Sequence, residues 1–373
     1  MAGIYLHIPF CRSACAYCNF HFSTSIKNKK HLIEAMQKEI LIRKDYLNNE
    51  TIGSIYFGGG TPSFLEINEI NDLLETINKN FKIDSDSEIT IEANPEDLNK
   101  NYLSELKSSG INRLSIGIQS FFEEDLKTLG RKHNYLQAEK CIDEAREAEF
   151  TNLSIDLIYG IPDSNLWKKN LEKLSNYNIP HFSAYSLTLE PKTIYHWQVN
   201  QQKAKAPDEQ YCNLCYTQLC DFASKNNYIH YEISNFGKNG FESKHNSAYW
   251  NNKNYLGIGP SAHSYNGSSR QWNISINNLY ISKIINNEAF YEIENLSRKD
   301  KINEYLLTHL RTKSGIKINE IKNLMTQKEY QSFLVTSEKI VKKGFAQINN
   351  DIFVLTEEAF YFSDGIISSL FTD

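Results

Sequence analysis

The sequence lacks the features that mark membrane and secreted proteins. No apolar run approaches about 18 residues, so we expect no membrane-spanning helix. The first residues, MAGIYLHIPF, contain no basic segment and no cleavage site, so we expect no signal peptide. An excess of charge of one sign is also missing. The net charge of −5 gives no sign of the basic surface that binds nucleic acid, so we expect no nucleic acid as a partner.

Cysteine is scarce, and its number is odd. Seven cysteines in a chain of 373 residues without a signal peptide favour a reducing compartment, so we expect a cytoplasmic protein. A hydrophobic content of 40% and a charged content of 23% are typical of a soluble globular protein. The length suffices for one large domain and a smaller one.

Three of the cysteines lie together near the start of the chain. Cys11, Cys15 and Cys18 follow an apolar run that is typical of a strand, and their spacing brings three thiolates into one short polar loop. Three thiolates bind three irons of a [4Fe-4S] cluster and leave the fourth iron open to another ligand. Because a structural zinc site needs four ligands, zinc completed by His21 or His7 is one alternative. Three unrelated buried thiols are the other.

Over about the first 230 residues, short β-branched apolar runs alternate with amphipathic helical patterns. The predicted strands are 3–9, 54–57, 88–93, 113–119, 153–159 and 182–187. The predicted helices are 31–47, 67–80, 99–109, 134–149, 166–177 and 208–226. Regular alternation predicts an α/β fold with a parallel sheet and right-handed crossovers. Six units are too few for a closed eightfold barrel, and they fit an open, partial barrel or a doubly wound sheet.

Polar and glycine-rich residues follow the predicted strands, unit after unit. Ligands bind at the carboxyl ends of strands in parallel α/β folds, so these residues should meet at one central site, which favours the barrel. The loop 58–62 (GGGTP) lets the backbone approach a ligand closely, with a simple tight turn as the alternative. Four of the residues at this rim are Glu92, Gln119, Arg131 and Asp156. Two carboxylates, an amide and a guanidinium would suit a zwitterionic ligand with a sugar. The alternative is that each of them makes a structural hydrogen bond.

Two further groups could carry chemistry. Cys212, Cys215 and Cys220 share one amphipathic helical pattern, where free cysteine packs as a small hydrophobe, so we expect core packing rather than a second metal site. His245 stands beside the aromatic pair 249–250, which would suit an axial ligand in a flat haem site. From chemistry alone, a hydrogen-bonded histidine in a loop that closes the barrel is favoured.

From about residue 296 the pattern changes to helices, over 300–313, 317–324 and 327–343. The pair Asn350-Asp351 then separates two short apolar runs, which predicts a hairpin, and a final helix is expected from Glu357. We therefore predict a partial barrel over 1–235, a connecting segment over 236–295 and a mostly helical, winged-helix-like C-terminal domain over 296–373. Its nearly balanced charge argues for a packing or lid module rather than for DNA binding.

The motifs together resemble those of a known family. The cysteine triplet with Tyr17 before its last cysteine, followed by GGGTP, is similar to the radical S-adenosylmethionine (SAM) superfamily. More narrowly, the chain resembles the oxygen-independent coproporphyrinogen III oxidase group and, within it, the HemW-type haem chaperones. The resemblance covers essentially the whole chain from Tyr5, in the segments YLHIPFC, YFGGGTPS, IEANPE, RLSIGIQSF, LGRKH, SIDLIYGIP, AYSLTLEP, YEISNF, HNSAYW and YLGIGPSAH.

The resemblance implies a partial (β/α)6 radical-SAM barrel and three cofactors, namely a [4Fe-4S] cluster, SAM and haem. It implies that Cys11, Cys15 and Cys18 hold the cluster. His245, in HNSAYW, matches a segment associated with haem binding in the chaperones. The resemblance implies that SAM is bound by Tyr5, Tyr17, Gly59, Gly60, Thr61 and Glu92. It also implies that Gln119, Arg131 and Asp156 match residues that contact a second SAM in the oxidase.

Two features depart from the oxidase. Phe20 stands where the oxidase has a fourth cysteine, and the chain starts shortly before Tyr5, without the oxidase's N-terminal extension. Both favour a chaperone that binds haem and passes it to respiratory haem proteins. The alternative is the oxidase itself, in which a radical derived from SAM abstracts hydrogen from a porphyrinogen propionate. We assign no catalytic residue, and we leave enzymatic activity, contact with a membrane surface and the oligomeric state open.

Overall fold

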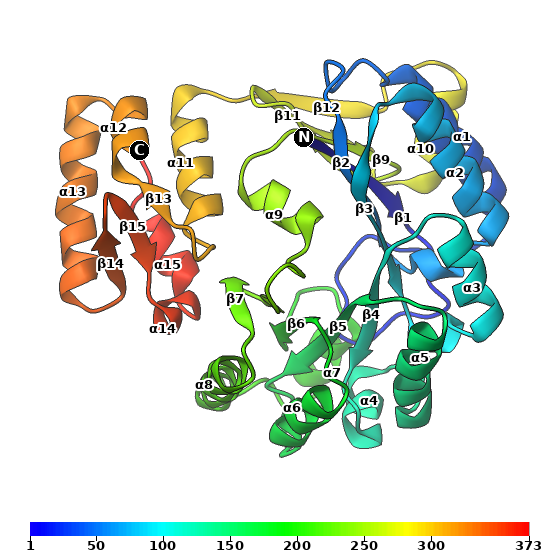
Figure 1. The fold of residues 1–373 in the computed structure, drawn as a ribbon, viewed down its shortest axis with the longest axis horizontal. Coiled ribbons are helices and arrows are strands. Elements are labelled where there is room, and N and C mark those ends of the chain that lie inside the picture. The colour runs from blue at the N-terminus through cyan, green and yellow to red at the C-terminus, as the bar shows by residue number, and fades with distance from the viewer. Residues whose placement is uncertain (373) are drawn as a thin grey trace.

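The computed structural model describes residues 1–372, and six parallel strands that pair in chain order form its centre (Figure 1). All the predicted strands are present, and β4 has the predicted bounds. The largest difference is in β3, which begins at Ile83 rather than at residue 88 because its first residues are polar and only partly buried. The strands are β1 (Ala2–Ile8), β2 (Ile52–Gly59), β3 (Ile83–Ala93), β4 (Arg113–Gln119), β5 (Asn152–Tyr159) and β6 (His181–Ser186).

Most positions of these strands are buried, as expected for a parallel sheet, and β4 is buried at every position. Crossover helices lie along the outer face of the curved sheet (Figure 1), so the predicted partial (β/α)6 barrel is confirmed and the doubly wound alternative is not. Among the six predicted helices, the largest error concerns α1, which ends at Ile42 rather than at residue 47. The helices of the (β/α)6 units are α1 (Lys29–Ile42), α2 (Ile67–Asn80), α3 (Lys100–Ser108), α4 (Glu123–Leu129), α5 (Tyr135–Glu147), α6 (Trp167–Asn176) and α8 (Glu209–Lys225). α4 was not predicted, nor was α7 (Ile194–Asn200), which lies in the connection between β6 and α8.

Strands that the sequence did not predict extend the sheet at both edges. Beside β1, β9 (Tyr255–Ile258) runs parallel, and β10 (His263–Tyr265), β11 (Ser269–Asn273) and β12 (Tyr291–Asn295) continue antiparallel. Beside β6 lie β8 (Asn235–Gly237) and β7 (Ile229–Glu232). The loop expected around His245 is instead a helix, α9 (Lys244–Trp250). No apolar run marks these strands, since they are short and β12 is exposed throughout.

The C-terminal region packs short helices around a three-stranded antiparallel sheet, and the predicted hairpin is confirmed. Asn350 and Asp351 form its turn with φ angles of +49° and +70°, the left-handed values that such turns require. The single final helix expected from Glu357 is wrong, because the chain forms two short helices there. The elements are α11 (Arg298–His309), β13 (Ile316–Lys317), α12 (Ile318–Leu324), α13 (Gln327–Lys342), β14 (Ala346–Asn349), β15 (Ile352–Leu355), α14 (Glu357–Phe360) and α15 (Ser363–Ser368).

This region lies on the open side of the sheet, opposite α1, α2 and α3 (Figure 1). Aromatic rings join it to the barrel. The rings of Phe360 and His230 meet edge to face at 5.1 Å, and the rings of Tyr361 and Tyr216 are 5.3 Å apart. The end of α14 is therefore fixed against α8 and β7 by packing.

A buried carboxylate fastens the added strands to the first helix. Glu39, on α1, accepts hydrogen bonds from the backbone N–H of Gly259 (2.8 Å), from Asn273 Nδ2 (2.7 Å) and from Tyr280 Oη (2.5 Å). It also lies 3.3 Å from the guanidinium of Arg43, whose side chain is buried as well. One side chain thus satisfies donors from α1, from the segment after β9, from β11 and from α10 (Asn277–Ile285).

Replacing Glu39 by glutamine should destabilise the protein strongly. Glutamine offers one acceptor oxygen instead of two and leaves Arg43 buried without a counter-ion, so we expect the free energy of unfolding to fall by about 3 kcal/mol or more. Urea unfolding of the full chain measures this change. Glu34→Gln, at an exposed position of the same helix, is the matched control and should cost less than about 0.5 kcal/mol. Equal losses in the two variants would contradict the role given to Glu39.

Candidate functional site

The carboxyl ends of the central strands open into one cavity of about 830 Å³. The structure brings most of the sequence-predicted site residues to its wall, although they come from segments after five different strands. This convergence is what parallel pairing of β1 to β5 dictates. The predicted residues on the wall are Cys11, Cys15, Tyr17, Cys18, Gly59, Gly60, Thr61, Glu92, Gln119, Arg131 and Asp156.

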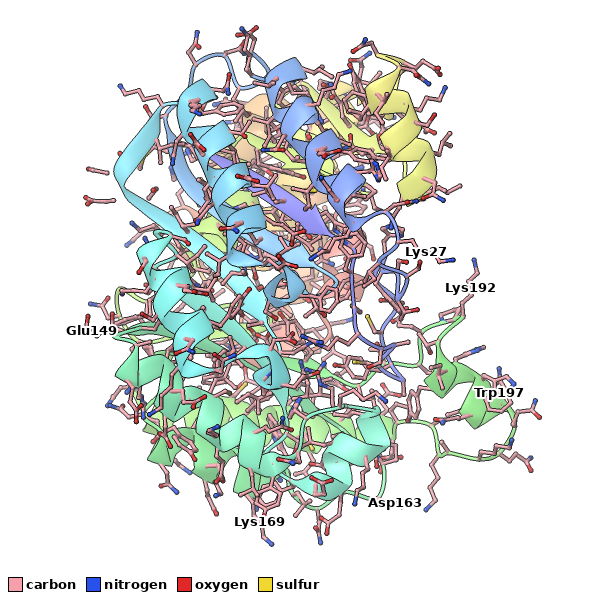
Figure 2. All side chains as sticks on the ribbon, turned by 90° about the vertical axis from the view of Figure 1, so that its right-hand side faces the viewer. Lys27, Glu149, Asp163, Lys169, Lys192 and Trp197 are labelled. Atoms are coloured by element: carbon pink, nitrogen blue, oxygen red, sulfur yellow. The ribbon has the colours of Figure 1, made fainter. Side chains whose placement is uncertain are left out.

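The cysteine loop is held on both sides by backbone hydrogen bonds. The N–H of Cys11 donates to the carbonyl of Ser23 (3.0 Å), and the N–H of Ala16 donates to the carbonyl of Leu129 (3.0 Å). The carbonyl of Ala16 accepts from the N–H of Tyr195 (2.7 Å), and both residues belong to a small apolar cluster under the loop. Tyr195 belongs to α7, in the protruding connection that Figure 2 labels at Lys192 and Trp197. The loop is therefore positioned by the barrel rather than by regular structure of its own.

Two of the three thiols receive hydrogen bonds from other rim residues. Thr61 Oγ1 donates to Cys11 Sγ, and Arg131 Nη1 donates to Cys15 Sγ, each at 3.3 Å. Burial raises the pKa of Cys11 to about 11, and it also raises the pKa of Cys18. The raised pKa values keep Cys11 and Cys18 protonated until a metal takes them as thiolates.

The surroundings of the thiols fit an open iron–sulfur cluster better than a closed zinc site. A Cβ atom on Gly60 would lie 3.0 Å from Cys11 Sγ, so the glycine lets the backbone come close to the loop. The histidines of the zinc alternative are engaged elsewhere. His7 Nε2 contacts the carbonyl of His21 (3.0 Å), His21 Nε2 contacts Asn277 Oδ1 (2.9 Å), and neither histidine lines the cavity. Three thiols with one open side match the ligand set of a [4Fe-4S] cluster.

Two buried carboxyl groups give the cavity its electrostatic character. Glu92 accepts hydrogen bonds from Tyr56 Oη (2.9 Å) and from the N–H of Gly59 (3.2 Å). Burial first, and the charge of Asp156 second, raise the pKa of Glu92 to about 7. Burial likewise raises the pKa of Asp156 to about 6. Carboxyl groups held in this way favour a ligand that brings an amine or hydroxyl donors.

Arg131 links the cysteine loop to the neighbouring strand ends. Its Nη2 donates to Asn94 Oδ1 (2.6 Å) and to the carbonyl of Gly117 (2.7 Å). Its Nε is buried and has no hydrogen-bond partner among residues 1–372. Gln119, next to it on the wall, has a φ of +66°, a strained value that is concentrated at functional sites. Because Arg131 lines the cavity, its positive charge favours an anionic group of a ligand there.

A second cavity, of about 670 Å³, contains His245 and Tyr5 and adjoins the first. His245 Nδ1 lies 2.9 Å from Ser54 Oγ, and its ring stacks on Tyr56 with centroids 5.0 Å apart. Burial lowers the pKa of His245 to about 4, so the imidazole is neutral at physiological pH. Glu88 accepts a hydrogen bond from the backbone N–H of His245 (3.1 Å) and so fixes the start of α9.

The predicted site residues are therefore divided between two cavities. Tyr5, expected at the SAM site by resemblance, lines the second cavity, and its hydroxyl contacts His7 Nδ1 (3.1 Å). The side chains common to both walls include Phe20, Glu92 and Tyr185. Phe20 is 70% exposed, an unusual fraction for an aromatic side chain between two cavities.

Several residues of the walls were missed by sequence reasoning. Glu232 is buried, accepts a hydrogen bond from Asn235 Nδ2 and has a pKa raised to about 7, mainly by burial. The segment YEISNF, residues 231–236, was the available signal, but it has no spacing that indicates chemistry. Phe360 and Phe362 reach the first cavity from the C-terminal region, and nothing in the sequence connects residues so far apart.

Comparisons with known proteins agree with this architecture. A family model described as the Radical SAM superfamily matches residues 5–174. The chain is 35% identical to the haem chaperone HemW of Lactococcus lactis, over 86% of this chain and 84% of that protein. It is 34% identical to the haem chaperone HemW of Bacillus subtilis, over 85% of each chain. The solved structure of the coproporphyrinogen III oxidase HemN from Escherichia coli superimposes with a TM-score of 0.86, over 100% of this chain and 90% of that one, at 23% identity.

The barrel and its cysteine loop define a protein of the radical SAM class. Within that class, the chain belongs to the family of the HemW haem chaperones. The family resemblance inferred from the sequence is thus confirmed. Membership of the radical SAM superfamily implies a [4Fe-4S] cluster and SAM, as expected. Among residues 1–372, none of the helices is long and apolar enough to cross a membrane.

The buried carboxyl of Glu92 should make the stability of the cluster-free protein depend on pH. Its pKa is raised from the ordinary 4.5 to about 7 in the folded protein, so the folded state binds this proton more tightly than the unfolded chain does. The resulting stabilisation is fully present below pH 4.5 and is lost as the pH rises through 7. Stability should therefore fall across this window.

Glu92→Gln should remove most of that dependence. We expect the difference between the free energies of unfolding at about pH 5 and about pH 8 to shrink by about 1–3 kcal/mol. Urea unfolding at the two pH values, under reducing anaerobic conditions, measures it. Glu105→Gln, at an exposed position of α3, is the control and should keep the pH dependence of the parent protein. An unchanged dependence in Glu92→Gln would refute the assignment.

Proposed function

We propose that this protein is a haem chaperone that holds a [4Fe-4S] cluster with SAM in the first cavity and haem in the second. It would deliver haem to respiratory haem proteins from the cytoplasm. The observation that carries the proposal is the position of His245, a neutral imidazole in an aromatic-lined cavity beside the cysteine loop. The names of the HemW relatives support the same function.

In the first cavity, Cys11, Cys15 and Cys18 would hold the cluster, which supplies the one electron that cleaves SAM when both are bound. The residues of the wall have separate roles toward SAM. Glu92 would accept from its amine, and the backbone of the GGGTP loop would pass close to its amino end. Arg131 would attract a carboxylate through its positive charge. The remaining SAM positions proposed from the resemblance are Tyr5, Tyr17, Gln119 and Asp156.

In the second cavity, His245 has the features of an axial haem ligand. Nδ1 is occupied by Ser54, so Nε2 is the nitrogen left for iron. With the hydrogen on Nδ1, donation to Ser54 Oγ would fix the ring and the tautomer, as second-shell partners of metal-bound histidines do. The rings of Tyr56, Tyr249 and Trp250 provide flat apolar walls for a porphyrin.

Replacing His245 by alanine should weaken haem binding by about tenfold or more, which corresponds to about 1.4 kcal/mol or more of binding free energy. An anaerobic haem titration followed at the Soret band measures the affinity and shows the change in ligation. His263→Ala is a matched control, because His263 lies on the wall of the same cavity. It should keep both the affinity and the position of the Soret band. The reverse result, with His263→Ala losing haem, would overturn the ligand assignment.

The competing function is oxygen-independent oxidation of coproporphyrinogen III, and the HemN-like fold is what favours it. The fold alone does not select a reaction. Phe20 stands where the oxidase has a fourth cysteine, which argues against it. A turnover assay with coproporphyrinogen III, SAM and a reductant, on the same preparation as the haem titration, decides between the two. Formation of protoporphyrinogen IX would overturn the chaperone proposal, and stable haem uptake without product supports it.

A further inference from the structure

Three side chains with metal-binding atoms meet outside both cavities, where the C-terminal region joins the barrel. Cys220 comes from α8, His230 from β7 and Glu357 from the start of α14. Their Sγ, imidazole nitrogen and carboxylate oxygen all lie within 4.8 Å of one another. His230 Nδ1 and Glu357 Oε1 are 3.1 Å apart. None of the three belongs to the cysteine loop or to the residues proposed for SAM and haem.

The orientation of His230 makes this cluster unusual. Its Nε2 lies 3.2 Å from the carbonyl of Ile233, which can only accept, so Nε2 carries the hydrogen. The ring is fixed by stacking on Phe236, with centroids 4.1 Å apart, and by the edge-to-face contact with Phe360. In the neutral imidazole, the lone pair of Nδ1 therefore faces the carboxylate of Glu357. Two acceptors at this distance need a proton or a metal cation between them.

The neighbouring cysteines do not share this arrangement. Cys212 Sγ lies 4.0 Å from the carbonyl of Gly160, and Cys215 is fully buried in the core of the barrel. Both pack as the sequence predicted. Cys220 differs because it is only partly buried and lies next to the imidazole and the carboxylate.

We propose that Cys220, His230 and Glu357 bind a Zn²⁺ ion. One thiolate, one imidazole and one carboxylate are ligands that zinc accepts, and the partly exposed Glu357, at 47%, leaves room for water in the fourth position. Around tetrahedral zinc these ligand atoms are separated by about 3.3–3.8 Å. The 3.1 Å between Nδ1 and Oε1 is already close to that value. The contact from Nε2–H to Ile233 is the outer hydrogen bond that zinc-bound histidines characteristically make.

A zinc ion at this position would connect two parts of the structure. Cys220 and His230 belong to the barrel, whereas Glu357 begins the helix whose end carries Phe360 to the wall of the first cavity. Zinc would thus join the C-terminal region to the barrel and hold part of that wall in place. The nearby charged groups include Lys313, which acts on Glu357, and Glu358 and Asp221, which act on Cys220.

The test uses the full chain with its iron–sulfur cluster reconstituted anaerobically, so that the three cluster thiolates are already occupied. Zn²⁺ is titrated against a competing chelator, and bound zinc and iron are counted by elemental analysis. We expect one saturable zinc per chain, unchanged iron, and a higher melting temperature, because a metal that binds only the folded state stabilises it. X-ray absorption at the zinc edge should show a single sulfur ligand, whereas zinc in the cysteine loop would show three.

Variants locate the ion. Cys220→Ala should weaken zinc binding by about 100-fold or more, since losing a ligand exceeds the effect of losing an outer-shell partner. Cys215→Ala, on the same helix, is the matched control and should keep the affinity. Glu357→Gln changes a half-exposed side chain that the fold does not depend on, and it should also lose zinc. The absence of saturable zinc in the parent protein overturns the proposal and leaves a protonated His–Glu pair. Equal zinc retention by Cys220→Ala and Glu357→Gln overturns it as well.

Discussion

Parallel hydrogen bonding between successive strands from β1 to β6 determines where the functional side chains can lie. Each strand must run in the same direction, so each returns through a helix on the outer face and each ends at the same edge. The cysteine loop has no regular structure of its own, and its position follows from the end of β1 and from backbone contacts at Ala16. Six local sequences thus build one site, although none of them encodes it alone.

The burial that stabilises the barrel also raises the free-energy cost of charged groups at its open end. Glu92 and Asp156 are carboxyl groups in a water-poor wall, and burial is the first cause of the raised pKa of each. Arg131 is only partly compensated, because one of its buried donors has no protein partner among residues 1–372. Groups held in this state cost free energy in the empty cavity and are satisfied by a ligand of opposite polarity. The wall is therefore organised for a zwitterion rather than for an apolar molecule.

The sequence predicts the elements whose signal is local. β4 and α2 have the predicted bounds, because a short segment with alternating buried apolar residues and a capped amphipathic helix are both readable within their own length. β12 was not predicted, since each of its residues is exposed and its pairing with β11 is the only reason it is a strand. The residues of the candidate site likewise divide into those that the local sequence places and those that only tertiary contacts bring together. Position in the strand order places Cys11 and Asp156 at one rim, whereas the cluster of His230 and Glu357 depends on tertiary contact between residues 127 apart.

The boundary between the two cavities is where the structure bears most directly on function. Phe20 lies on both walls, at the position where the oxidase resemblance calls for a cysteine. A thiol there would face the open side of the cluster loop as a reactive group, whereas a phenyl ring can only pack and exclude water. Because Phe20 is 70% exposed, its apolar surface has no protein partner large enough to cover it. A flat apolar ligand in the second cavity would cover that surface, which is what the proposed haem site requires of this boundary.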